Sequence, residues 1–222
     1  PFCTAPGVQW DLSSVADGTG GVIAAWRDRR SGTSQVYAVR MQVTGERYIS
    51  WPPNGAAVSG SLSGFDIRVV GDGGGGALFA WTRRTASGWQ VATTRIDAGG
   101  QVAMGWPGAG LTLSGAATAF APAIVADGAG GALVTWVDAR RDELDLFAQE
   151  ISARGEIRWT AEGARLCTAS GHQSTPILVS DGNGCGIAVW TDERVDGGDV
   201  YAGRLRADDR LVLSLPHAPV SQ

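Results

Sequence analysis

The sequence DGAGGALVTW at residues 127–136 decides the fold, because closely similar stretches occur three more times in the chain. The glycine-rich part recurs as DGTGG at 17–21, DGGGG at 72–76 and DGNGC at 181–185, at steps of 55, 55 and 54 residues. A tryptophan follows each of these Asp residues by nine positions, at Trp26, Trp81, Trp136 and Trp190. Such regular spacing indicates one supersecondary unit repeated four times in tandem.

Each unit is predicted to contain four antiparallel strands. An apolar run such as IRVV at 67–70 forms the first strand and ends at the Asp-Gly turn, where glycine supplies positive φ and the Asp side chain caps backbone amides. The second strand carries the phased tryptophan. The third contains alternating apolar and polar residues, as in VYAVRM at 36–41. A turn then leads to a fourth strand, which carries Trp51, Trp106 or Trp159, with Leu213 at the matching place in the last copy.

Four-stranded units of this length are typical of propeller blades, because a single small sheet must bury both faces against neighbours. The sequence therefore predicts an all-β fold, a β-propeller built of four blades of roughly 55 residues. The ring is either a closed four-bladed ring or the four-blade part of a larger ring. The chain is taken as a single domain, 1–222, with repeats at approximately 4–58, 59–113, 114–166 and 167–220. The phased tryptophans are expected to lie buried between blades.

Composition excludes several classes of function. The 222 residues carry a net charge of −4, which disfavours nucleic acid as a partner. No apolar run approaches the roughly 20 residues that span a bilayer, so membrane insertion is not expected. The three cysteines, Cys3, Cys167 and Cys185, lack metal-binding or disulfide-framework spacing and are expected to be small buried hydrophobes.

The pattern D-G-x-G-G-A-x-V-x-W-x-D-x-R, then D-x-Y/F-A, then G-x-x-x-W-x-x-x-G, resembles the tandem propeller-type repeats of secreted and cell-surface bacterial proteins. Residues 127–166 match it best, and the resemblance covers nearly the whole chain. It implies an extracellular or cell-surface location and a binding or spacer role, without naming a ligand.

A polar set follows the phased tryptophan in three of the four copies. Asp and Arg lie two and four residues after it, and a further polar residue lies nine after it; the members are Asp28, Arg30 and Gln35, then Asp138, Arg140 and Asp145, then Asp192, Arg194 and Asp199. The second copy changes all three together, to Arg83, Thr85 and Gln90. Joint loss suggests that these side chains touch, and we interpret the set as a structural cluster in which an Arg is held between carboxylates.

Metal binding is the alternative reading of these loops. Asp138, Asp142 and Asp145 place three carboxylates within eight residues, as do Asp192, Asp196 and Asp199, and calcium prefers such oxygen ligands. An Arg inside each loop opposes that reading, so no cofactor and no metal site is expected, with calcium as the open alternative.

Residues that break the repeat are the better candidates for ligand binding. Trp89 has no counterpart in the other copies and lies near Arg83 and Arg84, while Asp66 and Arg68 lie on a first strand that faces a central channel. Trp10 occupies the position of Phe65, Phe120 and Ser174 and is expected to pack locally.

Catalytic motifs are absent from the sequence: His172 and His217 lie at different phases of the repeat, and no nucleophile elbow or phosphate loop occurs. We therefore expect no enzyme, but a non-catalytic extracellular interaction or structural module that binds protein or glycan. The alternative is a carbohydrate-active enzyme or its accessory lectin domain, motivated by surplus Trp and acidic residues. A homodimer, or further blades in the parent chain, could complete the ring.

Overall fold

The computed structural model describes residues 1–115, 118–195 and 197–206, and within them it contains four antiparallel sheets and no helix. The first sheet holds β1 (Gln9–Ala16), β2 (Val22–Asp28), β3 (Gln35–Met41) and β4 (Ala56–Ala57). The second holds β5 (Phe65–Gly71), β6 (Ala77–Thr85), β7 (Gly88–Ile96) and β8 (Leu111–Thr112). The third holds β9 (Ala119–Ala126), β10 (Ala132–Asp138), β11 (Asp145–Ile151) and β12 (Ala164–Cys167). The fourth holds β13 (Gln173–Ser180), β14 (Cys185–Asp192) and β15 (Asp199–Arg206).

Each sheet is one copy of the repeat, and we call the four sheets blades 1 to 4 in chain order. Strands follow one another in the sheet in the order in which they occur in the chain, as a meander. The fourth strand expected around Leu213 lies outside the described residues.

The Asp-Gly turn joins the first two strands of every blade as predicted. In blade 1, one oxygen of Asp17 accepts hydrogen bonds from the amides of Thr19 and Gly21, at 2.8 and 2.7 Å. Gly18 and Gly20 have φ of +76° and +98°, a region that side chains disfavour. The same bonds recur around Asp72, Asp127 and Asp181. A local sequence signal therefore sets the hairpin.

The core consists of three similar layers between successive blades. Trp81 packs on Ile23, Val36 and Ala38 of blade 1, while Trp136 and Trp190 fill the next two layers. All four phased tryptophans are at most 2% exposed, as predicted. Burying a large apolar side chain contributes roughly 1.5–3 kcal/mol, so these layers hold the blades together.

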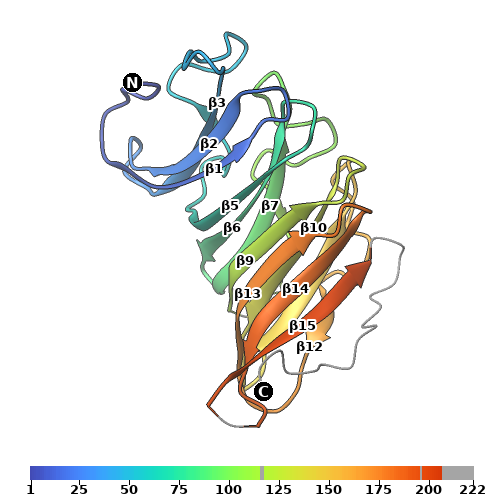
Figure 1. Cartoon of the computed structure of the whole chain (residues 1–222). Coiled ribbons are helices and arrows are strands. Elements are labelled where there is room, and N and C mark those ends of the chain that lie inside the picture. Colours follow the sequence, from blue (N-terminus) through green and yellow to red (C-terminus); the bar gives the residue numbers. More distant parts are fainter. Residues whose placement is uncertain (116–117, 196, 207–222) are drawn as a thin grey trace.

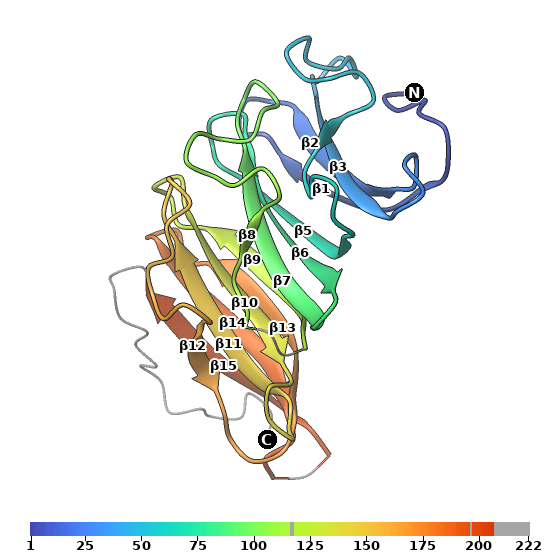
Figure 2. The ribbon, with the colours of Figure 1, turned by 180° about the vertical axis from the view of Figure 1, so that it is seen from behind.

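The blades follow one another along an arc that does not close. The first strands lie side by side in the order β1, β5, β9 and β13. Figure 1 shows blade 1 and blade 4 at opposite ends of the molecule, and Figure 2 shows the same separation from behind. The closed four-bladed ring is therefore wrong for this structure, because blade 4 does not reach blade 1.

Candidate functional site

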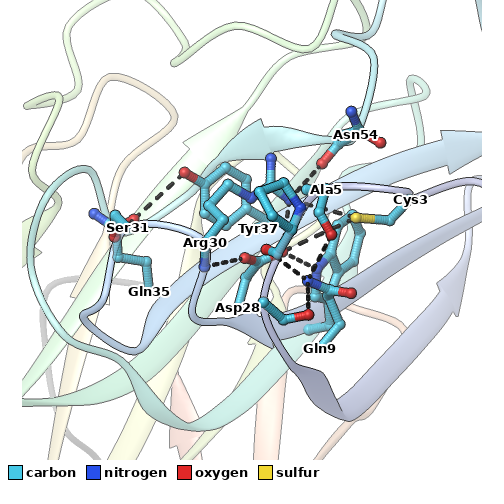
Figure 3. A network of polar contacts seen from close by, with 12 residues as sticks. Cys3, Ala5, Gln9, Asp28, Arg30, Ser31, Gln35, Tyr37 and Asn54 are labelled. Carbon is cyan, nitrogen blue, oxygen red and sulfur yellow. Dashed lines mark hydrogen bonds and ion pairs between the residues drawn. The ribbon is translucent and has the colours of Figure 1, made fainter.

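The repeated Asp-Arg pair lies at the end of the second strand of blade 1. The Asp28 carboxylate accepts hydrogen bonds from the indole N–H of Trp26 at 2.9 Å and from Nη2 of Arg30 at 2.6 Å. Figure 3 shows Arg30 between this carboxylate, the carbonyl of Asn54 and the ring of Tyr37. Burial raises the pKa of Asp28, but the Arg30 and Trp26 bonds outweigh it, so the pKa lies below its usual value.

The same pair recurs in blades 3 and 4. Arg140 binds Asp138 through Nε at 2.8 Å and Nη2 at 2.6 Å, and Arg194 binds Asp192 at 2.9 and 2.6 Å. Each Arg also lies over an aromatic ring. The guanidinium thus ties the second strand to the third, which is a structural role.

The third member of the predicted set does not join this pair. Asp145 and Asp199 face Asp138 and Asp192 across the strand pairs, but no hydrogen bond joins either one to the Arg of its own blade in the described residues. Asp145 instead approaches Arg141 at 3.8 Å, and burial raises the pKa of its carboxyl. The partner on the second side of the Arg differs from the expected one: in blade 1 it is the Asn54 carbonyl, and in blade 3 it is the Glu162 carbonyl together with the Glu162 carboxylate, 3.5 Å from Nη1 of Arg140.

Blade 2 keeps the guanidinium but loses its carboxylate. Arg83 reaches the carbonyl of Ala109, which corresponds to Asn54 in blade 1, and also contacts Thr112 and Gln90. Among the described residues no acidic group pairs with Arg83, and its burial lowers its pKa. The indole N–H of Trp81, which would bind the missing Asp, has no hydrogen-bond partner.

A second ion pair, absent from our sequence expectations, secures the Asp-Gly turn. The other oxygen of Asp17 accepts hydrogen bonds from Nε of Arg40 at 2.7 Å and from the Thr19 hydroxyl at 2.9 Å, and Oδ2 of Asp72 accepts one from Nη2 of Arg95 at 2.8 Å. Burial raises the pKa of Asp17, but the amide bonds and Arg40 lower it well below its usual value. In the sequence, this ion pair is indicated by an Arg that lies 23 residues after the turn Asp. The same spacing gives Arg204 in blade 4, whereas Glu150 takes the place of the Arg in blade 3.

Two candidate binding residues of blade 2 belong to a row of stacked side chains on one rim. Trp89 packs edge-on against Phe65 with ring centres 5.1 Å apart, and Arg84 lies 5.9 Å from the Trp89 ring. The row continues into blade 1, where Arg27 lies over both Phe65 and Trp10, at 4.3 and 4.6 Å. We call Trp10, Arg27, Phe65, Trp89 and Arg84 the aromatic row. The sequence suggested Trp89 and Arg84, but not that Arg27 joins them to Trp10.

Each first strand has one strained position, and those of blades 1 and 2 directly follow Trp10 and Phe65 of the aromatic row. Asp11, Asp66, Ala121 and Thr175 occupy the same place in the repeat and have positive φ between 49° and 58°, although none is glycine. The first strand bulges here in every blade. Such strain persists only where the surrounding structure holds it, and it concentrates at functional sites.

Only blades 1 and 2 carry a carboxylate at this strained position. Asp11 approaches Arg27 at 3.7 Å, and Asp66 accepts a hydrogen bond from Thr82 at 3.3 Å. Both carboxylates are exposed, and their strands, β1 and β5, lie side by side. Arg68, exposed on the same strand as Asp66, binds only its neighbour's carbonyl among the described contacts. The candidate site therefore consists of Asp11, Asp66 and the aromatic row.

The remaining polar candidates do not assemble a centre. His172 accepts a hydrogen bond from the amide of Leu144 at 3.1 Å, whereas His217 and Asp196 lie outside the described residues. Within residues 1–115, 118–195 and 197–206, no three His, Cys, Asp or Glu side chains gather as metal ligands would. Asp138 is bound by Arg140 in an ion pair at 2.6 Å.

Comparisons with known proteins give similarity in structure alone. No protein-family model and no curated protein matches the chain. A thermostable family-43 glycoside hydrolase shares 10% identity and a TM-score of 0.54, over 95% of this chain and 76% of that one. A TolB-like protein from Agrobacterium tumefaciens shares 16% identity and a TM-score of 0.52, over 96% of this chain and 64% of that one. The fold is propeller-like. Among the described residues, no helix is both long and apolar enough to cross a membrane.

These solved structures overturn two expectations from the sequence. We expected a non-catalytic interaction or structural module and no enzyme, but in the family-43 protein the same arrangement of sheets carries a glycoside hydrolase. The absence of a linear catalytic motif does not exclude catalysis. Carboxylates that come from the first strands of different blades form no linear motif.

Proposed function

We propose that this chain is a carbohydrate-active enzyme that hydrolyses glycosidic bonds, with Asp11 and Asp66 as its acidic pair. The observation that carries the proposal is that both carboxylates occupy the strained bulge of adjacent first strands, beside the aromatic row. The glycoside hydrolase activity named for a solved structure of similar fold adds support.

The chemistry needs two carboxyl groups on opposite sides of the scissile bond. One protonates the departing oxygen, and the other attacks the anomeric carbon or activates a water molecule. We assign Asp11, which lies 3.7 Å from the Arg27 guanidinium, as the nucleophile or base. Asp66, which accepts a hydrogen bond from the Thr82 hydroxyl, is then left as the proton donor by elimination.

The aromatic row suits a sugar platform. Aromatic faces bind the apolar C–H faces of sugars, and half-buried indoles offer a fixed surface with little entropy to lose. Trp10 and Trp89 are half-buried, unlike the phased tryptophans, so aromatic surface is exposed at this rim. The alternative that every Trp lies between blades, which would exclude a sugar platform, does not hold.

The test is hydrolysis of a panel of aryl glycosides and plant polysaccharides, including arabinan, by the purified chain and single variants. We expect Asp11→Asn and Asp66→Asn each to lower kcat/KM by at least about 100-fold, the usual contribution of acid–base groups. Asp142→Asn, an exposed carboxylate on the loop between β10 and β11, is the matched control and should retain full activity.

Two results would contradict the proposal. Turnover that survives in both the Asp11 and Asp66 variants would place the chemistry elsewhere. Glycan binding that Trp89→Ala abolishes, without turnover of any substrate, would instead indicate an accessory lectin domain.

Two further parts of the proposal rest on the repeat itself. The four blades are the four-blade part of a larger ring, supported by the open arc. The protein works outside the cell or at its surface, supported by the resemblance to secreted bacterial repeats. Periplasmic or culture-supernatant fractionation with an antibody tests the second point, and a purely cytoplasmic signal would refute it.

A further inference from the structure

The three internal interfaces share one arrangement. In each, one face of a blade packs against the opposite face of the next blade. The forward face, which packs on the following blade, presents Leu133, Leu146 and Leu166 in blade 3. The backward face, which packs on the preceding blade, presents the phased tryptophan, such as Trp190 in blade 4. Every internal interface pairs one forward with one backward face.

The forward face of blade 4 is apolar, and no described residue covers it. Its residues at the interface positions are 37 to 62% exposed, whereas their counterparts in blade 3 are at most 7% exposed. The exposed residues are Ile177, Val179, Ile187 and Val200, and their buried counterparts are Ala123, Val125, Leu133 and Leu146. Soluble monomers rarely expose a continuous apolar sheet face, so this face is suited to contact with another blade.

The backward face of blade 1 is the matching half. Leu12 is 68% exposed, whereas Ile67 at the same position in blade 2 is 3% exposed. Phe2 packs edge-on against Trp26, and Cys3 lies by Asp28 as Cys167 lies by Asp192. The N-terminal segment therefore stands in for the end of a preceding fourth strand and leaves Leu12 open.

We propose that the forward face of blade 4 binds the backward face of blade 1 in a second copy of this chain. Blade 1 of the same copy is not the occupant, because it lies at the opposite end of the arc (Figure 1). Both halves of the interface occur on one chain, so two copies related by a two-fold axis make two identical head-to-tail contacts. The pairing repeats an interface that the chain already forms three times.

Light scattering of the purified chain tests the proposal. We expect a particle of twice the 23.0 kDa monomer mass. Ile177→Asp with Val200→Asp, and separately Leu12→Asp, should each convert it to a monomer with an unchanged circular dichroism spectrum. These side chains are exposed in the single chain, so the fold survives. Ile49→Asp, at a residue 89% exposed but outside both faces, is the control and should remain dimeric.

An equimolar mixture of the two monomeric variants distinguishes head-to-tail pairing from other dimer arrangements. The Leu12 variant keeps its forward face and the Ile177/Val200 variant keeps its backward face, so an equimolar mixture should recover a heterodimer. A monomeric wild type overturns the proposal, as does a dimer that tolerates the Leu12 change, since that dimer would pair two forward faces. A dimer insensitive to both sets of changes overturns it as well.

Discussion

Replacing a phased tryptophan with phenylalanine should have very different effects in blades 2 and 3. Both Trp81 and Trp136 are fully buried, so the loss of apolar area is similar and cancels in the comparison. Trp136→Phe also removes the bond to the charged Asp138 at 3.1 Å, which contributes roughly 1.5–3 kcal/mol. Trp81→Phe removes an N–H without a partner and relieves its burial cost of about 1–3 kcal/mol.

We therefore expect Trp136→Phe to be less stable than Trp81→Phe by about 3 kcal/mol, or roughly 6–12 °C in Tm for a chain of this size. Guanidinium chloride unfolding, followed by circular dichroism, measures the two midpoints under identical conditions. Equal destabilisation by the two changes would refute the reasoning, because it would mean that the Trp81 N–H is satisfied in the folded protein.

Three further predictions test the ion pairs and the packing. Burial raises and the Arg194 bond lowers the pKa of Asp192, to about 2. Because the pKa of Asp192 is lower in the folded protein, about 2 kcal/mol of stability is present above pH ~4 and is lost as the pH falls toward ~2. We expect Asp192→Asn to reduce this loss when the free energy of unfolding is measured as a function of acid pH. Gly163→Ala places a methyl group 2.4 Å from the Trp136 ring, at a residue with a φ of +88°. We expect the free energy of unfolding to fall by about 3 kcal/mol in the same assay. A variant as stable as the wild type would show that the ring can shift. Arg83→Met should be neutral or stabilising, whereas Arg140→Met leaves the buried Asp138 carboxylate without a positively charged partner and should cost about 3–5 kcal/mol. Equal thermal shifts in the two variants would contradict this contrast.

The architecture could be predicted because its signals are local and repeated four times. The Asp-Gly turn is specified by hydrogen bonds within five residues, and the phased Trp by the alternation of a strand. The Asp28–Arg30 contact was also visible, since both residues change together in blade 2.

The candidate site could be predicted only in part. Trp89 stood out because it has no counterpart in the other copies, and Asp66 because its strand was expected to face a central channel, but Asp11, at the same repeat position in blade 1, was missed. Its importance comes from positive φ at a bulge and from the neighbouring strand of blade 2, and neither feature is encoded in the residues beside it. The Arg27 contact with Phe65 likewise joins residues of different blades.

By itself, the sequence determined the repeat, its turns and its buried tryptophans, because each depends on residues close together in one unit. Only the tertiary structure decided which side chains of different blades meet, and that the arc stays open, with blades 1 and 4 at its two ends (Figure 1). The physical reason is that the rotation from one blade to the next is set by the packing of whole sheet faces, and small differences in that packing add up over four copies.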